Sequence, residues 1–94
     1  MDQLRFEWDK QKSALNRDKH GVTFEEAQTV FFDPHALIID DPDHSLTEER
    51  FIIMGVSRAL RLLVVAHCYR TDEGTIRIIS ARKATKLEAK YYAR

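Results

Sequence analysis

The chain has 94 residues, and its 15 lysine and arginine residues balance 15 aspartate and glutamate residues, so the formal net charge is zero. This balance excludes a histone-like protein that binds nucleic acid through bulk charge, and the length predicts one domain over residues 1–94. The longest apolar runs are too short to cross a membrane, the first residues do not resemble a signal peptide, and the single Cys68 fits a reduced cytoplasmic protein.

The first predicted elements are a short strand and a surface helix. Residues 6–8 have the pattern of a strand or an extended lead-in. Asp9 can then cap a helix over residues 10–20, because its carboxylate can accept hydrogen bonds from the first free amides. Gly21 is placed to end this helix in the left-handed conformation that glycine tolerates.

A second helix and a short strand are predicted next. Thr23 and Glu26 have the spacing of a capping box and predict a helix that runs to about Phe32. Residues 36–39 form a short apolar run that predicts a strand. Residues 40–45 are rich in turn formers and predict a loop.

Three strands and a last helix complete the chain. Residues 50–57, 60–70 and 75–81 predict strands, the last two joined by a turn at residues 71–74. Thr85 begins a second capping box and opens the last helix. The order β-α-α-β-β-β-β-α predicts the α+β class, with an antiparallel sheet that carries two N-terminal helices and one C-terminal helix.

Charge is distributed unevenly along the chain. Residues 1–47 carry ten acidic and five basic side chains, whereas residues 48–94 carry five acidic and ten basic ones. Arg82, Lys83 and Lys86 lie where the last strand gives way to the last helix. Because guanidinium groups match phosphate oxygens, this junction predicts a confined phosphodiester site; a solvated basic helix explains it equally well.

The motifs along the chain form one ordered pattern. They comprise Phe6, Trp8, Asp9, Lys12, Asn16, Lys19, His20, Gly21, Val22, Phe24, Ala27, Asp41, Pro42, Asp43, His44, Ile76, Arg77, Ile78, Ile79, Ser80, Ala81, Arg82, Ala84, Thr85 and Glu88. Each piece alone is weak, but the joint pattern covers almost the whole chain and resembles the BrnT family of ribonuclease toxins of type II toxin–antitoxin systems.

The resemblance implies a compact RelE-like fold and cleavage of RNA that arrests translation. It also implies neutralisation by a cognate DNA-binding antitoxin similar to BrnA, through which alone the complex would bind operator DNA. We expect the toxin to be a homodimer within that complex. Two other functions fit the same residues: a noncatalytic nucleic-acid-binding subunit, and a small interaction module whose charged face docks an acidic partner.

A small ribonuclease can work without metal, because the 2′-hydroxyl of the RNA attacks the adjacent phosphate. The protein then supplies acid and base groups and positive charge for the transition state. His67 is the expected acid–base group, since an imidazole titrates near neutral pH, and Arg82 and Arg77 are the other expected catalytic residues. A half-buried strand histidine with one backbone hydrogen bond is the competing interpretation of His67.

A second set of basic residues is expected to bind RNA: Lys19, His20, Arg61, Arg70 and Lys83. His20 has a competing explanation, because a histidine at a helix C-terminus interacts favourably with the last carbonyls. Each arginine also has a competing explanation, because it could simply form an ion pair at the surface.

Strand register decides which of these side chains share a face. A four-residue turn pairs Arg70 with Thr75, and His67 then faces the same way as Arg82. A one-residue slip or bulge would bring Arg77 beside His67 instead. The sequence leaves both registers open.

The chain offers no convincing ligand set for a metal, and we expect no cofactor. A loop with the possible ligands Asp40, Asp41, Asp43 and His44 could bind a hard cation. Its residues also favour turns, which explains their presence without a metal. Cys68 directly follows His67 in a strand, so their side chains point to opposite faces and a Cys–His nucleophile is disfavoured.

Overall fold

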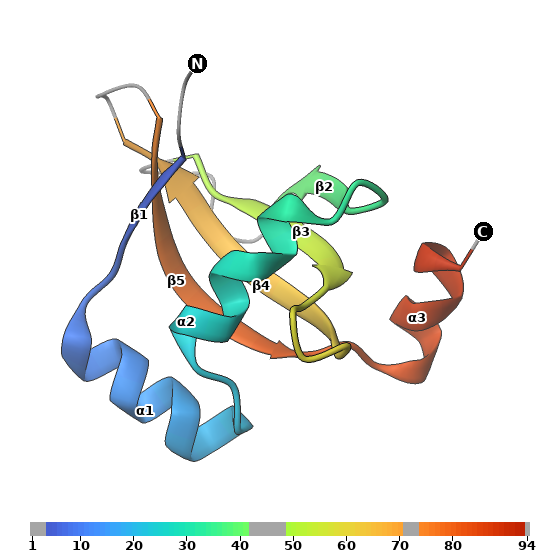
Figure 1. The fold of residues 1–94 in the computed structure, drawn as a ribbon, viewed down its shortest axis with the longest axis horizontal. Coiled ribbons are helices and arrows are strands. Elements are labelled where there is room, and N and C mark those ends of the chain that lie inside the picture. Colours follow the sequence, from blue (N-terminus) through green and yellow to red (C-terminus); the bar gives the residue numbers. More distant parts are fainter. Residues whose placement is uncertain (1–3, 42–48, 71–73, 94) are drawn as a thin grey trace.

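The computed structural model describes residues 4–41, 49–70 and 74–93, which form a five-stranded sheet with helices (Figure 1). The strand order across the sheet is β1-β5-β4-β3-β2. The elements in chain order are β1 (Arg5–Glu7), α1 (Lys10–His20), α2 (Phe24–Ala27), the 3₁₀ helix η1 (Gln28–Phe32), β2 (Leu37–Asp40), β3 (Phe51–Val56), β4 (Leu62–Tyr69), β5 (Thr75–Lys83) and α3 (Lys86–Tyr92).

The sheet is mixed, so the expected α+β class is confirmed but the fully antiparallel sheet is wrong at one strand pair. The pairs β2–β3, β3–β4 and β4–β5 are antiparallel. β1 runs parallel to β5, with Phe6 opposite Ile76 and Glu7 opposite Arg77. A parallel pair needs a long crossover, and the chain between β1 and β5 is long enough to provide one.

Side-chain caps set the helix boundaries where the sequence predicts them. The Asp9 carboxylate accepts hydrogen bonds from the first-turn amides of α1 at 2.8 and 3.0 Å, and Gly21 ends that helix with φ of 69°. Thr85 and Glu88 form a complete capping box at α3, where the Glu88 carboxylate accepts from the Thr85 amide and the Thr85 hydroxyl from the Glu88 amide.

The second helix is shorter than predicted and changes its winding. Thr23 caps α2 by accepting a hydrogen bond from the Glu26 amide at 3.1 Å, as expected. After Ala27 the chain continues as the tighter η1. The hydroxyl of Thr29 donates to the Glu26 carbonyl at 2.7 Å, and such a bond back to the preceding turn competes with regular α-helical bonding.

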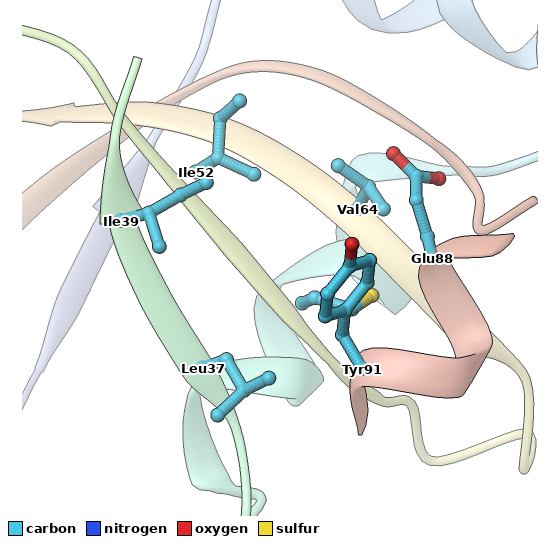
Figure 2. Close-up of a pocket in the computed structure, with 7 residues that line it drawn as sticks. Leu37, Ile39, Ile52, Val64, Glu88 and Tyr91 are labelled. Atoms are coloured by element: carbon cyan, nitrogen blue, oxygen red, sulfur yellow. The ribbon is translucent and has the colours of Figure 1, made fainter. Parts of the chain in front are cut away.

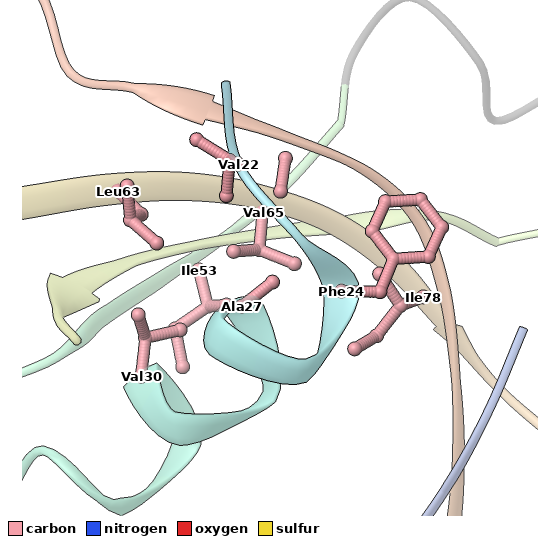
Figure 3. Close-up of a cluster of buried hydrophobic side chains, with 9 residues drawn as sticks. Val22, Phe24, Ala27, Val30, Ile53, Leu63, Val65 and Ile78 are labelled. Atoms are coloured by element: carbon pink, nitrogen blue, oxygen red, sulfur yellow. The ribbon is translucent and has the colours of Figure 1, made fainter. Parts of the chain in front are cut away.

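The hydrophobic core lies between α2, η1 and one face of the sheet (Figure 3). Its buried members come from both layers: Val22, Phe24, Ala27, Val30, Ile53, Leu63, Val65, Ile78 and Ala81. Fully burying a side chain of this kind contributes about 1.5–3 kcal/mol, so this layer holds the helices to the sheet. We call this side of the sheet the helix face and the opposite side the open face.

Asn16 fastens α1 to the helix face. Its amide nitrogen donates to the carbonyl oxygens of Val22 at 3.0 Å and Ala81 at 2.8 Å, and its amide oxygen accepts from the Ala81 amide at 3.0 Å. Because the side chain is buried and all its contacts are to backbone, the position demands an amide of this length. α1 is therefore held by one polar side chain of an otherwise exposed helix.

A bulge in β5 decides which side chains reach the open face. Arg70 donates its amide to the Thr75 carbonyl at 3.1 Å, as the four-residue turn predicts. The register then shifts between Ala66 and His67, and Ile79 is left without a partner. Because of this extra residue, the side chains of β5 after Ile79 point to the opposite faces from those they would have in a regular strand.

The register expected from the four-residue turn is therefore right that Arg77 and His67 lie on different faces and wrong about Arg82, whereas the slipped register is wrong about Arg77. Arg77 lies opposite Cys68, and Arg82 lies opposite Val64, so both arginines share the open face. His67 lies opposite Ile78, which belongs to the core, so the histidine is on the helix face.

Helix α3 is attached at both ends by polar contacts and has no buried residues. Glu88 near its start pairs with Arg82 of β5. Near its end the Tyr92 hydroxyl donates to the Asp33 carboxylate at 2.5 Å. α3 thus projects beyond the end of β5, apart from the helices of the helix face (Figure 1).

Candidate functional site

Three arginines lie along the open face, and we call Arg70, Arg77 and Arg82 the arginine row. Glu7 of β1 lies beside the first two: its Oε2 is 2.9 Å from Arg77 Nη1 and 3.4 Å from Arg70 Nε. The side chains remain partly exposed, by 38% for Glu7, 34% for Arg77 and 52% for Arg70. Parallel pairing of β1 with β5 is what brings this carboxylate to the row.

The third arginine is bound more tightly. Arg82 Nη1 and Nη2 donate to the two carboxylate oxygens of Glu88 at 2.8 and 2.9 Å. These bonds, helped by the Thr85 amide, lower the pKa of Glu88 from 4.5 to about 2. Glu88 therefore stays ionised and joins the start of α3 to the end of β5, while 40% of the Arg82 side chain remains exposed.

His67 lies away from the arginine row, inside the core. Its ring is fully buried, Nδ1 is 3.3 Å from the Val65 carbonyl oxygen, and Nε2 has no hydrogen-bond partner. Phe31 meets the ring edge-on at 4.8 Å between centroids, and Tyr69 does so at 5.3 Å. Burial lowers the pKa of His67 below 6.5, so the ring is neutral at physiological pH.

The remaining expected RNA-binding residues gather at the other face. Arg61 contacts both carboxylate oxygens of Glu26, which also accepts the Ser57 hydroxyl at 2.6 Å. Arg61 also donates to the carbonyl oxygen of Gly21 at 3.1 Å, directly after Lys19 and His20. Lys83 lies opposite Leu63, on the helix face.

The sequence-predicted site residues thus form two groups. One is the arginine row. The other is a basic group at the end of α1, composed of Lys19, His20, Arg61 and Lys83. The hydrogen bond from Arg61 lowers the pKa of Glu26, so Glu26 stays ionised and forms an ion pair with Arg61 between α2 and the β3–β4 turn. The structure therefore gives Arg61 a role in holding these elements together.

Glu7 is a functional candidate that sequence reasoning missed. It lies between Phe6 and Trp8 of the first motif, where the alternation of a strand places it on the opposite side from those aromatic rings. Its significance depends on the neighbour of β1 in the sheet, which no local pattern reveals.

A groove lies on the open face beside the arginine row, between β2 and α3 (Figure 2). Its volume is about 410 Å³, and the residues that line it are Leu37, Ile39, Ile52, Met54, Val64, Glu88 and Tyr91. Val64 is the residue opposite Arg82, so the groove and the arginine row meet at that pair.

Within residues 4–41, 49–70 and 74–93, no group of three or more metal-ligating side chains comes together. Asp43 and His44 of the aspartate-rich loop lie outside these residues. None of the described helices is long and apolar enough to cross a membrane.

Comparisons with known proteins give one family match and one similar fold. A family model described as "Ribonuclease toxin, BrnT, of type II toxin-antitoxin system" matches residues 8–88. The fold is similar to the 1.1 Å crystal structure of the Brucella abortus ribonuclease toxin BrnT, with a TM-score of 0.67 and 20% identity over 88% of this chain and 99% of that chain. None of the curated proteins compared with the chain matches it.

Proposed function

The chain belongs to the BrnT family of ribonuclease toxins of type II toxin–antitoxin systems, and we propose that its open face binds RNA and cleaves it without a metal ion. The observation that carries this proposal is the arginine row with Glu7 in contact with two of its three members, Arg70 and Arg77. Cations that converge on an exposed sheet surface suit a phosphodiester, and a carboxylate beside them can accept a proton.

In the proposed reaction the phosphate to be cleaved binds between Arg77 and Arg82. Guanidinium groups placed there would stabilise the negative charge that develops on phosphorus-bound oxygens. To bind, the phosphate competes with Glu7 for Arg77 and with Glu88 for Arg82. Both arginines are partly exposed, which leaves donors for that competition.

Glu7 is the proposed base. It takes the proton of the 2′-hydroxyl while the 2′-oxygen forms a bond to phosphorus. The bond from phosphorus to the 5′-oxygen breaks, that oxygen takes a proton from solvent, and the product ends in a 2′,3′-cyclic phosphate. Glu88 is the other described carboxylate in contact with the arginine row, but its capping bonds already occupy it.

His67 has no direct part in this scheme, contrary to the sequence-based expectation. A fully buried ring on the helix face makes no contact with RNA on the open face. The basic group at the end of α1 is proposed to guide the RNA by charge, since Lys19 and Lys83 are exposed.

The wider biology is proposed from the family. The family is described as a ribonuclease toxin of a type II toxin–antitoxin system, which implies an RNA target and an antitoxin. We propose that the fold is RelE-like, that cleavage arrests translation in the cytoplasm, and that a BrnA-like antitoxin neutralises the toxin. The toxin would be a homodimer in that complex and would reach operator DNA only through the antitoxin.

Cleavage of a labelled RNA, with a DNA of the same sequence beside it, tests the proposal. The purified protein should cleave RNA, spare DNA, and keep its activity in EDTA. Arg77→Ala and Arg82→Ala should each lower the rate by about 10²- to 10³-fold, as the loss of one transition-state donor does. Arg17→Ala is the control, because Arg17 is an exposed arginine of α1 outside both basic groups. Activity that vanishes in EDTA and returns with Mg²⁺ would contradict the scheme.

A noncatalytic nucleic-acid-binding subunit is the second candidate. One observation favours it: His67 is the only histidine in the described strands, and it faces away from the arginine row. In the same experiment this candidate predicts that RNA binds, that binding weakens in the arginine variants, and that no RNA is cut.

A further inference from the structure

The groove between β2 and α3 combines apolar walls with a charged end. Its floor and one wall are aliphatic, and the Tyr91 ring and the Glu88 carboxylate come from α3 (Figure 2). Arg82 lies at the end of the groove, because it pairs with Glu88 and lies opposite Val64. A ligand that fills the groove therefore meets an apolar surface first and a guanidinium group next.

We propose that this groove is the docking site for the antitoxin, and that the segment that docks carries an apolar anchor followed by a carboxylate. The anchor fills the space among Leu37, Ile39 and Tyr91. The carboxylate binds the exposed part of Arg82, beside Glu88. This inference rests on the proposed function, and it explains neutralisation, because the bound segment covers one end of the arginine row.

The lining favours a protein over RNA as the occupant. A nucleobase that leaves water needs hydrogen-bond partners for its edges, and an unpaired buried polar group costs about 1–3 kcal/mol. Among the described residues that line the groove, the polar side chains are Glu88 and Tyr91, and the Arg82 guanidinium lies at its end. Aliphatic and aromatic side chains need no such partners and gain from the burial.

The neighbouring strand supplies a second reason. β2 is at the edge of the sheet, and within the described part of the chain it pairs only with β3. Three successive apolar side chains on it are exposed: Leu37 by 41%, Ile38 by 54% and Ile39 by 59%. An exposed apolar edge is a template for another strand, so an extended segment can pair with β2 while its alternate side chains enter the groove.

The charge at the groove selects an acidic segment. Arg82 is the cation at its end, and 40% of its side chain remains exposed beside Glu88. A segment that carries a carboxylate therefore meets a complementary charge there. The two contacts that hold α3, Glu88 with Arg82 and Tyr92 with Asp33, keep the second wall in place before any partner arrives. A preformed groove lowers the cost of ordering on binding.

Two groove variants and one neighbouring control test the proposal. Ile39→Ala and Tyr91→Ala remove side chains of the groove, whose exposures of 59% and 55% make loss of folding unexpected. Ile38→Ala is the control, since Ile38 has the same side chain on the same strand but lies opposite the core residue Ile53. Circular dichroism and thermal unfolding verify that each variant is folded.

The probe is the protein encoded by the reading frame next to the toxin gene, purified and titrated by calorimetry. We expect each groove variant to weaken binding by about tenfold or more, the effect of losing an interface anchor, while Ile38→Ala changes it less than about twofold. RNA cleavage by each variant alone should stay within about twofold of the parent, and the neighbouring protein should no longer inhibit the groove variants at concentrations that silence the parent.

Three results would overturn the inference. Full binding by both groove variants would place the interface elsewhere. A raised KM for RNA with unchanged antitoxin binding would make the groove a base-binding pocket. A toxin that is dimeric alone and monomeric after Ile39→Ala would make it an interface between two copies of this chain. A parent protein that cuts no RNA would contradict the proposed function. The titration would still show whether the antitoxin docks in the groove.

Discussion

Glu7 lies between two guanidinium groups, and a carboxylate in that position holds the arginines in place and can accept a proton. Its contacts with Arg77 at 2.9 Å and Arg70 at 3.4 Å leave it 38% exposed, so a substrate hydroxyl can approach it. The position of Glu7 therefore fits the role of the proposed base. Three features give it that position: it lies on a strand, the strand pairs in parallel with β5, and the side chain lies on the open face.

The substitution Glu7→Gln separates the two roles of this side chain. Glutamine keeps an oxygen that can accept hydrogen bonds from Arg77 but is a very weak base. We expect kcat for RNA cleavage to fall by about 10²- to 10⁴-fold, the usual contribution of general acid–base catalysis, with little change in KM. Glu25→Gln, at an exposed glutamate of α2, is the control. A fully active Glu7→Gln enzyme would show that another group takes the proton.

His67 should make the stability of the protein depend on pH. In the unfolded chain it takes up a proton as the pH falls below 6.5, whereas burial keeps its pKa lower in the folded protein. Its contribution to stability is therefore complete above pH 6.5 and is lost as the pH falls toward the folded-state pKa.

The expected result is a fall in the free energy of unfolding between about pH 7.5 and pH 5.5 that is smaller in His67→Leu. The difference can reach at most about 1.4 kcal/mol for each pH unit below 6.5, which is the value of one proton. Urea denaturation at a series of pH values measures it. An identical pH dependence in parent and variant would mean that His67 is protonated as easily in the fold as outside it.

At the scale of elements, Asn16 is the main link between α1 and the sheet. Asn16→Ala should lower the free energy of unfolding by about 2–4 kcal/mol, because it leaves buried groups of Val22 and Ala81 without partners. Gln11→Ala, at an exposed position of the same helix, should change it by less than about 0.5 kcal/mol. Equal effects of the two substitutions in thermal and urea unfolding would contradict this role.

The elements differ in how far the sequence predicts them. Caps are local, so Asp9, Thr23 and Thr85 mark the helix starts correctly. Strands with strong apolar patterns are also found close to their observed limits. The parallel pairing of β1 depends on which strand it meets after a long crossover, and this is a property of the whole fold.

The candidate site was less predictable than the fold because it depends on one unpaired residue. Arg77 and Arg82 are five positions apart and would lie on opposite faces of a regular strand. Ile79 in the bulge of β5 brings them to the same face and leaves His67 on the other. Nothing in the residues around Ile79 distinguishes a bulge from regular pairing, so the expected union of His67 with Arg82 was wrong.

At the scale of the whole molecule, a 94-residue chain buries a limited core and gains stability from a bound partner. With the antitoxin at about a hundred times its Kd, the gain is about 2.7 kcal/mol. For a domain of this size that corresponds to a rise in Tm of roughly 10–20 °C. Differential scanning fluorimetry of the toxin with and without the antitoxin measures the shift, and Ile38→Ala should show the parent's shift.

The carboxylates beside the arginine row compete with any anion that binds to it. Glu7 and Glu88 already hold the guanidinium groups in the free protein. A lone phosphate, such as that of a free nucleotide, must displace a tethered carboxylate, and it makes no second contact that would offset the lost ion pair. A polymer presents several phosphates at once and displaces them together, because each contact raises the local concentration of the next. We therefore expect the arginine row to bind RNA chains in preference to the abundant pool of mononucleotides.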